Sequence, residues 1–151
     1  MAKADYRQIA IDTFNRIRAT FPQLTMTLEL HHPHVDINMD IQKQTGMDFD
    51  VNLNLQNIDE LHLSAGSFWV EWFPCDEPKK VEEYFSAVTG LLSGEYRIRE
   101  HRRGNKVFKA ELQRPENNDW TTIATWSRLR LPSLRKQTIS IMQNRSTKLT
   151  P

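Results

Sequence analysis

The chain of 151 residues is poor in cysteine and has no long apolar run. Cys75 is its only cysteine, which excludes an internal disulfide bond and a metal site built from several cysteines. No apolar run approaches the ~20 residues that a membrane-spanning helix needs. The first seven residues also lack the apolar core of a secretion signal. We therefore expect a cytoplasmic protein with no membrane partner.

The short motifs that mark common catalytic and cofactor-binding sites are missing as well. There is no glycine-rich phosphate loop, no G-x-S-x-G, no H-E-x-x-H and no pair of cysteines. We therefore expect no cofactor, and the sequence favours binding over catalysis.

Two polar clusters invite a metal interpretation, but their spacing argues against it. The segment 36–40 begins like a calcium-binding loop, yet Ile41 and Met47 stand where that loop needs glycine and glutamate. His31, His32 and His34 lie in extended chain, where neighbouring side chains point to opposite faces. At most two of them converge, so we expect no metal site.

The residues that are present describe a folded domain with uneven charge. Apolar residues make up 38% and charged residues 26%, which is typical of a globular protein. We expect one domain over residues 1–143 and a flexible polar tail over 144–151. Residues 1–75 hold 5 basic and 10 acidic residues, whereas residues 76–151 hold 15 and 9. Either the two halves pack together, or they polarise the surface toward a charged partner.

Hydrophobic periodicity predicts two helices and many strands. Apolar residues three and four apart predict a helix over residues 3–21, which Pro22 ends. A second helix has Pro78 in its first turn and Gly94 at its C-terminal cap. Period-2 alternation or short apolar runs predict strands over 24–31, 35–42, 49–56, 61–63, 68–73, 96–102, 108–112, 120–126 and 136–142.

This order of elements predicts an antiparallel α+β fold. Its order is one helix, four or five strands, a second helix and three or four strands, so hairpins link most neighbouring strands. Only two helices cover so many strands. We therefore expect both helices to pack on a mainly antiparallel, strongly curved sheet with part of one face bare.

The strand 68–73 carries bulky apolar residues on both faces. Phe68, Val70 and Trp72 point one way, and Trp69 and Phe73 point the other. Such a strand is covered on two sides, or it shows aromatic side chains to a partner. We therefore select Trp69, Trp72 and Phe73 as candidate binding residues.

A basic ladder follows the second helix. Its members Arg97, Arg99, His101 and Arg103 share one strand face. An acidic protein partner suits this face, and so does single-stranded nucleic acid if Trp120 or Trp126 stacks on its bases. The alternative is a solvated face with cross-strand pairs, which the sequence pI of 7.9 favours over nucleic acid.

A third candidate is a pocket between the curved sheet and the second helix. Cys75 stands just before that helix, whose dipole favours a thiolate, although the neighbouring Asp76 and Glu77 oppose it. His62 and Trp72 are expected nearby. A small-molecule site or an enzyme centred on these residues is therefore an alternative to protein binding.

In the order of its elements, the chain resembles small bacterial binding proteins such as secretion chaperones and toxin-immunity proteins. The missing catalytic and cofactor motifs favour a non-enzymatic role. Our first hypothesis is thus a protein-interaction domain, which binds another protein or itself as a homodimer through the aromatic strand and the basic ladder. A small-molecule site or enzyme is the second hypothesis, and a single-stranded nucleic-acid binder is the third.

Overall fold

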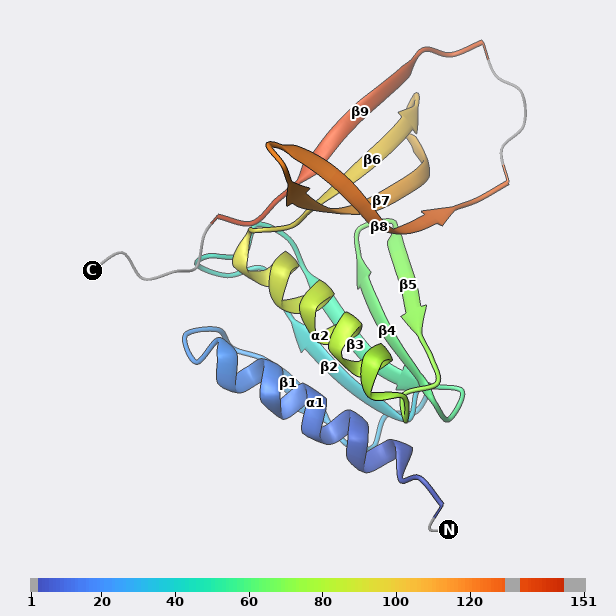
Figure 1. Cartoon of the computed structure of the whole chain (residues 1–151). Coiled ribbons are helices and arrows are strands. Elements are labelled where there is room, and N and C mark those ends of the chain that lie inside the picture. Colours follow the sequence, from blue (N-terminus) through green and yellow to red (C-terminus); the bar gives the residue numbers. More distant parts are fainter. Residues whose placement is uncertain (1–2, 130–133, 146–151) are drawn as a thin grey trace.

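Residues 3–129 and 134–145 are described by the computed structural model (Figure 1). Within these ranges the chain forms two helices and two antiparallel sheets, of five and four strands. In chain order the elements are α1 (Tyr6–Thr20), β1 (Thr27–Glu29), β2 (Ile37–Ile41), β3 (Val51–Gln56), β4 (Glu60–Ala65), β5 (Phe68–Trp72), α2 (Pro78–Ser93), β6 (Arg97–Arg103), β7 (Lys106–Glu116), β8 (Asp119–Ser127) and β9 (Gln137–Met142).

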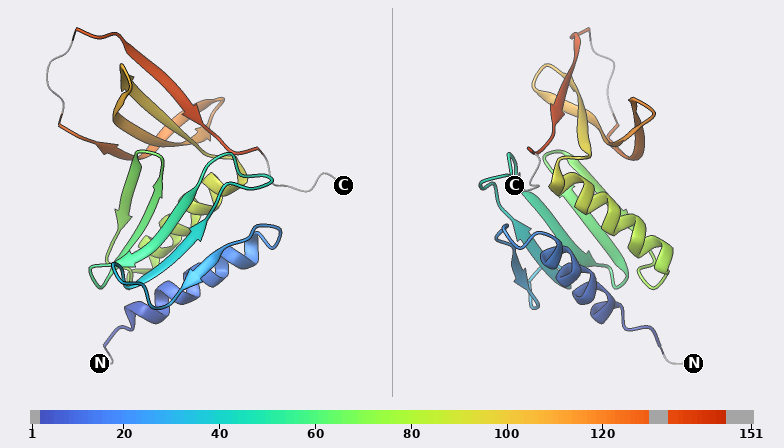
Figure 2. Two further views of the ribbon diagram at one scale, coloured as in Figure 1. Left: turned by 180° about the vertical axis from the view of Figure 1, so that it is seen from behind. Right: turned by 60° about the vertical axis from the view of Figure 1, so that its left-hand side comes forward.

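The five-stranded sheet is a meander in which strands β1 to β5 pair in sequence order. Both helices lie on the same side of it (Figures 1 and 2). Alternation explains this arrangement, because every second residue of a strand points to one face. Met39, Leu53 and Leu63 point toward the helices and are fully buried in the core. The opposite face of the sheet is left without a helix.

Both helices end close to the predicted positions, but α1 begins at Tyr6 and not at residue 3. Asp5 caps α1 by accepting a hydrogen bond from the backbone N–H of Gln8 at 3.0 Å. Gly94 ends α2 in a left-handed conformation with φ of 81°. A side chain at Gly94 would also meet the backbone carbonyl of Asn144, which lies 2.1 Å from the position of a Cβ atom. Glycine is therefore required there twice over.

Asn144 fastens the last described segment to the fold. Its side chain is buried, donates to the carbonyl of Leu91 at 3.1 Å and accepts from the backbone N–H of Asp48 at 2.8 Å. The sequence analysis placed Asn144 in a flexible tail, whereas the structure makes it an anchor. Residues 146–151 of that predicted tail lie outside the described residues.

The four-stranded sheet has the order β8-β7-β6-β9 and lies across one end of the five-stranded sheet and the C-terminal end of α2 (Figures 1 and 2). Ile98, Ala110 and Leu112 point inward from it and join the same hydrophobic core as the helices. Its other face is polar, with Arg97 and Arg99 partly exposed and His101 and Gln113 buried.

The predicted antiparallel α+β class is confirmed, but the prediction of one strongly curved sheet is wrong. Two sheets form, and neither is strongly curled. The reason is α2, which stands between β5 and β6 in the chain, so that β6 pairs with β7 and β9 instead of extending the first sheet. No helix among the described residues is long and apolar enough to cross a membrane.

Candidate functional site

The face of the five-stranded sheet that the helices leave bare is an ordered polar grid, which we call the outer face. Cross-strand register builds it from two rows. One row contains Glu29, Asn38, Asn54, His62 and Glu71, and the next contains Thr27, Asp40, Asn52, Ser64 and Trp69. Trp69 is the single large apolar side chain in these rows.

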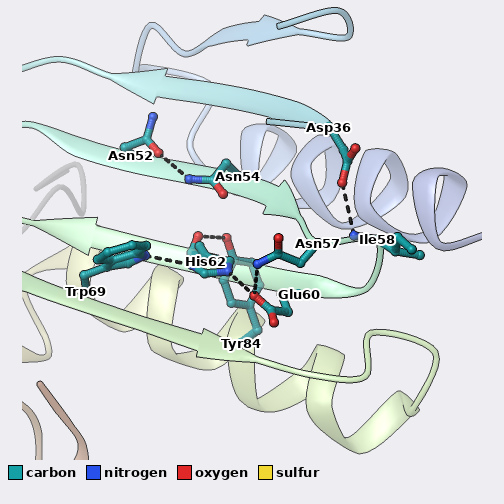
Figure 3. Close-up of polar contacts among 9 residues, drawn as sticks. All are labelled: Asp36, Asn52, Asn54, Asn57, Ile58, Glu60, His62, Trp69 and Tyr84. Carbon is teal, nitrogen blue, oxygen red and sulfur yellow. Dashed lines mark hydrogen bonds and ion pairs between the residues drawn. The ribbon is translucent and has the colours of Figure 1, made fainter. Parts of the chain in front are cut away.

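Three asparagines in the middle of the outer face form an amide relay. Asn54 donates to Asn52 Oδ1 at 2.9 Å, and Asn52 donates to Asn38 Oδ1 at 2.8 Å and to Asp40 Oδ1 at 2.6 Å. Asn38 in turn donates to the other carboxylate oxygen of Asp40 at 3.1 Å. The hydrogen bonds of the relay are thus all donated in one direction, from Asn54 toward Asp40, and the last acceptor is the carboxylate of Asp40. Figure 3 shows its first step from Asn54 to Asn52.

A second chain of hydrogen bonds holds Trp69 in place (Figure 3). The indole Nε1–H of Trp69 donates to His62 Nδ1 at 2.7 Å, and His62 Nε2 contacts Glu60 Oε2 at 2.8 Å. Because an indole only donates, His62 Nδ1 must be the acceptor. Its other nitrogen therefore carries the proton toward Glu60, and the ring is neutral in this arrangement.

Burial within this chain is uneven. His62 is only 3% exposed, whereas Trp69 is 51% exposed. Hydrogen bonds from Asn57 and His62 hold the pKa of Glu60 below its usual value of 4.5. From below the sheet, the buried hydroxyl of Tyr84 donates to the carbonyl of His62 at 2.8 Å. The result is an exposed indole on a fixed support.

Strand β5 has the two faces that alternation predicts. Phe68 is fully buried, and Trp72 packs edge-on against Tyr84 of α2 with ring centroids 5.5 Å apart. Trp69 lies on the opposite face, and Phe73 directly follows the end of the strand; each is about half exposed. The candidate binding residues therefore separate into Trp69 and Phe73, which are accessible, and Trp72, which belongs to the core side.

The basic ladder lies on the four-stranded sheet, on the face opposite to Ile98, whereas Trp69 belongs to the five-stranded sheet. Arg97, Arg99 and His101 pair in register with Gln113, Glu111 and Lys109 of β7. A shift in register between His101 and Arg102 interrupts the alternation before Arg103, whose guanidinium lies 5.6 Å from the ring centre of Phe108. The structure does not join this ladder to the aromatic strand in one surface.

Ladder members already have partners within the sheet. Arg97 donates to Gln113 at 2.9 Å and stacks on Trp120 at 4.0 Å from the ring centre. His101 binds Glu111, which also accepts from Thr122 at 2.8 Å. Burial opposes ionisation of Glu111, but these hydrogen bonds and the charge of Lys109 outweigh it and lower its pKa. Arg97 occupies the indole face on which a nucleotide base would stack.

Cys75, His62 and Trp72 are not brought together in a pocket. His62 lies on the outer face, Trp72 lies on the helix side, and Cys75 is buried with its thiol 3.8 Å from the carbonyl oxygen of Tyr6. Burial, with the nearby charges of Asp59 and Asp76, raises the pKa of Cys75 to about 11. This environment disfavours the thiolate that a nucleophile needs.

A groove of about 610 Å³ lies elsewhere, between α2 and β8. Trp72 and Tyr96 contribute to its wall together with charged side chains of α2. Neither Cys75 nor His62 reaches it. As for metals, no group of three His, Cys, Asp or Glu side chains within residues 3–129 and 134–145 is placed to hold an ion.

The residues that support Trp69 are not evident from the sequence. No sequence pattern selects Glu60, and the polar face that includes Asn38, Asn52 and Asn54 is typical of a solvated strand face, with a looser acidic site for a metal or a basic partner as the alternative. The available signal was their alternation on two neighbouring strands, which places asparagine and aspartate side chains of both strands on one face.

Comparisons with known proteins add no name to this site. No family model matches the chain, and neither the curated proteins nor the solved structures include a match. The site must therefore be interpreted from its own geometry.

Proposed function

We propose that this chain is a non-enzymatic protein-interaction domain that binds its partner through the outer face around Trp69 and Phe73. The observation that carries the proposal is an exposed tryptophan whose polar atom is already bonded within the domain. Large aromatic side chains held in one conformation lose little entropy on binding and are common anchors of interfaces.

The exposed aromatic side chains support this proposal, because they are not needed to stabilise the fold. The hydrophobic core lies on the helix side of the sheet, so the exposed parts of Trp69 and Phe73 contribute little to it. Glu71 lies between them on the same strand face and supplies a polar rim. An aromatic centre with a polar border is the usual anatomy of a protein interface.

The test uses light-activated cross-linking in cells that contain the protein. Benzoylphenylalanine replaces the exposed Phe73, and the same residue replaces the exposed Ile123 of β8 as the matched control. We expect position 73 to capture a defined protein that position 123 does not capture. The captured protein, once purified, should then bind Trp69→Ala at least about tenfold more weakly than the unaltered domain.

Two outcomes contradict the proposal. One is equal capture at positions 73 and 123, and the other is an unchanged affinity in Trp69→Ala. The melting temperature of Trp69→Ala is measured in parallel, so that a loss of binding through unfolding is recognised.

The groove between α2 and β8 favours a second candidate function, the binding of a small molecule. Its volume of about 610 Å³ and its aromatic wall at Trp72 and Tyr96 suit a compact organic ligand. A screen of small aromatic compounds by NMR, with Tyr96→Ala as the comparison, tests it. Shifts confined to the outer face would count against this candidate.

A further inference from the structure

We infer that the partner segment bound by the outer face is basic, with arginine or lysine side chains placed over Asp40 and Trp69. This inference rests on the proposed function and gives the chemistry of the partner. The hydrogen-bonding groups that remain unpaired on the outer face lead to this inference.

The amide and indole donors of the outer face are used internally, whereas carboxylate acceptors are left over. The side-chain N–H groups of all three relay asparagines point to neighbouring oxygens, and the indole N–H of Trp69 points to His62. Carboxylates of Asp40 and Glu71 retain lone pairs, because each carboxylate accepts about four hydrogen bonds. A complementary ligand must therefore bring donors.

Asn54 marks a place where a donor is missing. Its side chain is only 8% exposed, and Oδ1 is buried without a hydrogen-bond partner among the described residues. Buried acceptors are nearly always paired, and those that are not call for an explanation. Asn54 pairs in register with His62, and His62 with the exposed Glu71, so the missing donor is needed within the outer face itself.

Charge selects a cationic donor over a neutral one. From Leu24 to Phe73 the chain holds eight acidic residues and a single cation, Lys43. The two rows of the outer face contain carboxylates and no lysine or arginine. An exposed indole beside carboxylates suits a guanidinium, which stacks on the ring and pairs with the carboxylate.

Spacing favours an extended polypeptide over a single metal ion. Asp40 on β2 and Trp69 on β5 share one row, three strand spacings apart, which is about 14 Å. One ion cannot contact both. Side chains four residues apart on an extended peptide are separated by about 13–14 Å, so cations at positions i and i+4 of a segment crossing the strands reach both residues.

The test measures a synthetic probe by fluorescence polarisation. The probe is a labelled peptide with two arginines four residues apart in a serine and threonine background, and its matched control carries citrulline at both positions, which removes the charge. We expect the arginine peptide to bind and the citrulline peptide to bind at least about fivefold more weakly. Binding of the arginine peptide should also weaken as salt is raised.

Protein variants locate the site. Asp40→Asn and Glu71→Gln should each weaken binding of the arginine peptide about fivefold, and Asn54→Leu should weaken it as well. The melting temperature of Asn54→Leu is measured in parallel, because this variant also loses the hydrogen bond to Asn52. Asp12→Asn makes the same change of charge on α1, on the other side of the sheet, and should bind within about twofold of the unaltered domain. These four variants separate local recognition from net charge.

Three outcomes overturn the inference. They are equal binding of the arginine and citrulline peptides, equal loss in Asp40→Asn and Asp12→Asn, and self-association that Arg99→Glu abolishes, which would assign the outer face to the basic sheet of a second copy. If the protein captured at position 73 binds Asp40→Asn normally but Trp69→Ala weakly, the basic segment is wrong and the proposed function stands.

Discussion

Each sheet of this protein holds a buried histidine that is bonded to a glutamate, and the two pairs differ in what holds the second ring nitrogen. In the five-stranded sheet His62 binds Glu60, and its other nitrogen accepts from Trp69. In the four-stranded sheet His101 binds Glu111, and its other nitrogen contacts Gln137 at 3.1 Å. Gln137 has an amide that both donates and accepts, whereas an indole only donates.

The two pairs therefore differ in how many hydrogen-bonding arrangements of the imidazole they accept. The amide of Gln137 can rotate and offer its oxygen, so the His101 pair accommodates either protonation state. The His62 pair works in one state only and keeps an aromatic side chain at the surface. The sheets also differ in charge, because residues 24–73 are mainly acidic while residues 97–145 hold twelve lysines and arginines against four acidic residues. We therefore expect binding to depend on the outer face of the five-stranded sheet, and stability to depend on the faces of both sheets that point into the core.

The largest expected effect compares the two faces of β5. Phe68→Ala removes a fully buried ring and should lower the free energy of unfolding by about 3–5 kcal/mol. Trp69→Ala, one residue further, removes a half-exposed ring and one hydrogen bond and should cost about 1 kcal/mol. Urea denaturation followed by circular dichroism measures both, and equal losses would show that Trp69 belongs to the folding core.

The next prediction compares polar networks on the open faces of the two sheets. Asn52→Ala breaks the amide relay at a residue bonded to three neighbours and should cost about 1–3 kcal/mol. Thr122→Ala removes an exposed hydroxyl bonded to Glu111 and Gln113 and should cost less than about 1 kcal/mol. If Thr122→Ala proves the more damaging in urea denaturation, the relay is not a source of stability.

Much of this architecture follows from the sequence because its signals are local. Period-2 alternation placed strands near every one of β1 to β9, and Gly94 marked the end of α2 because a left-handed cap needs glycine. Parity alone put Trp69 on the face opposite to Phe68. Local backbone geometry carries each of these inferences.

Contacts between distant segments escaped prediction. Whether β6 extends the first sheet or begins a second depends on the path of α2 over the core, and no local pattern encodes that path. Asn144 appeared to belong to a polar tail because its partners, Leu91 and Asp48, are far away in the chain. His62 was selected, but for a pocket with Cys75, because the sequence does not reveal that its side chain points to the outer face.

A third prediction tests the support of Trp69 by substitution. His62→Phe removes the nitrogen that accepts from the indole of Trp69, so one hydrogen bond worth about 1 kcal/mol is lost. In ¹H–¹⁵N NMR spectra the indole N–H signal of Trp69 should then move from its position in the unaltered domain. An unchanged indole signal in His62→Phe would contradict this hydrogen bond.

The smallest expected effect compares the two glutamates in acid. The pKa values of Glu60 and Glu111 both lie below 4.5 in the folded protein, so each carboxylate stabilises the fold above pH 4.5, and this contribution is lost as the pH falls through the folded-state pKa. Glu60→Gln and Glu111→Gln should therefore be less stable than the unaltered domain at pH 7, and the difference should be smaller at pH 3. Glu111→Gln should show the larger difference at pH 7, because Glu111 binds Thr122, His101 and Lys109 in a more buried position. Glu60 has more contact with water, which weakens its pairing with His62. Thermal melts at both pH values measure this, and a larger effect at Glu60 would mean that support of Trp69, and not the pairing within the second sheet, dominates the acid response.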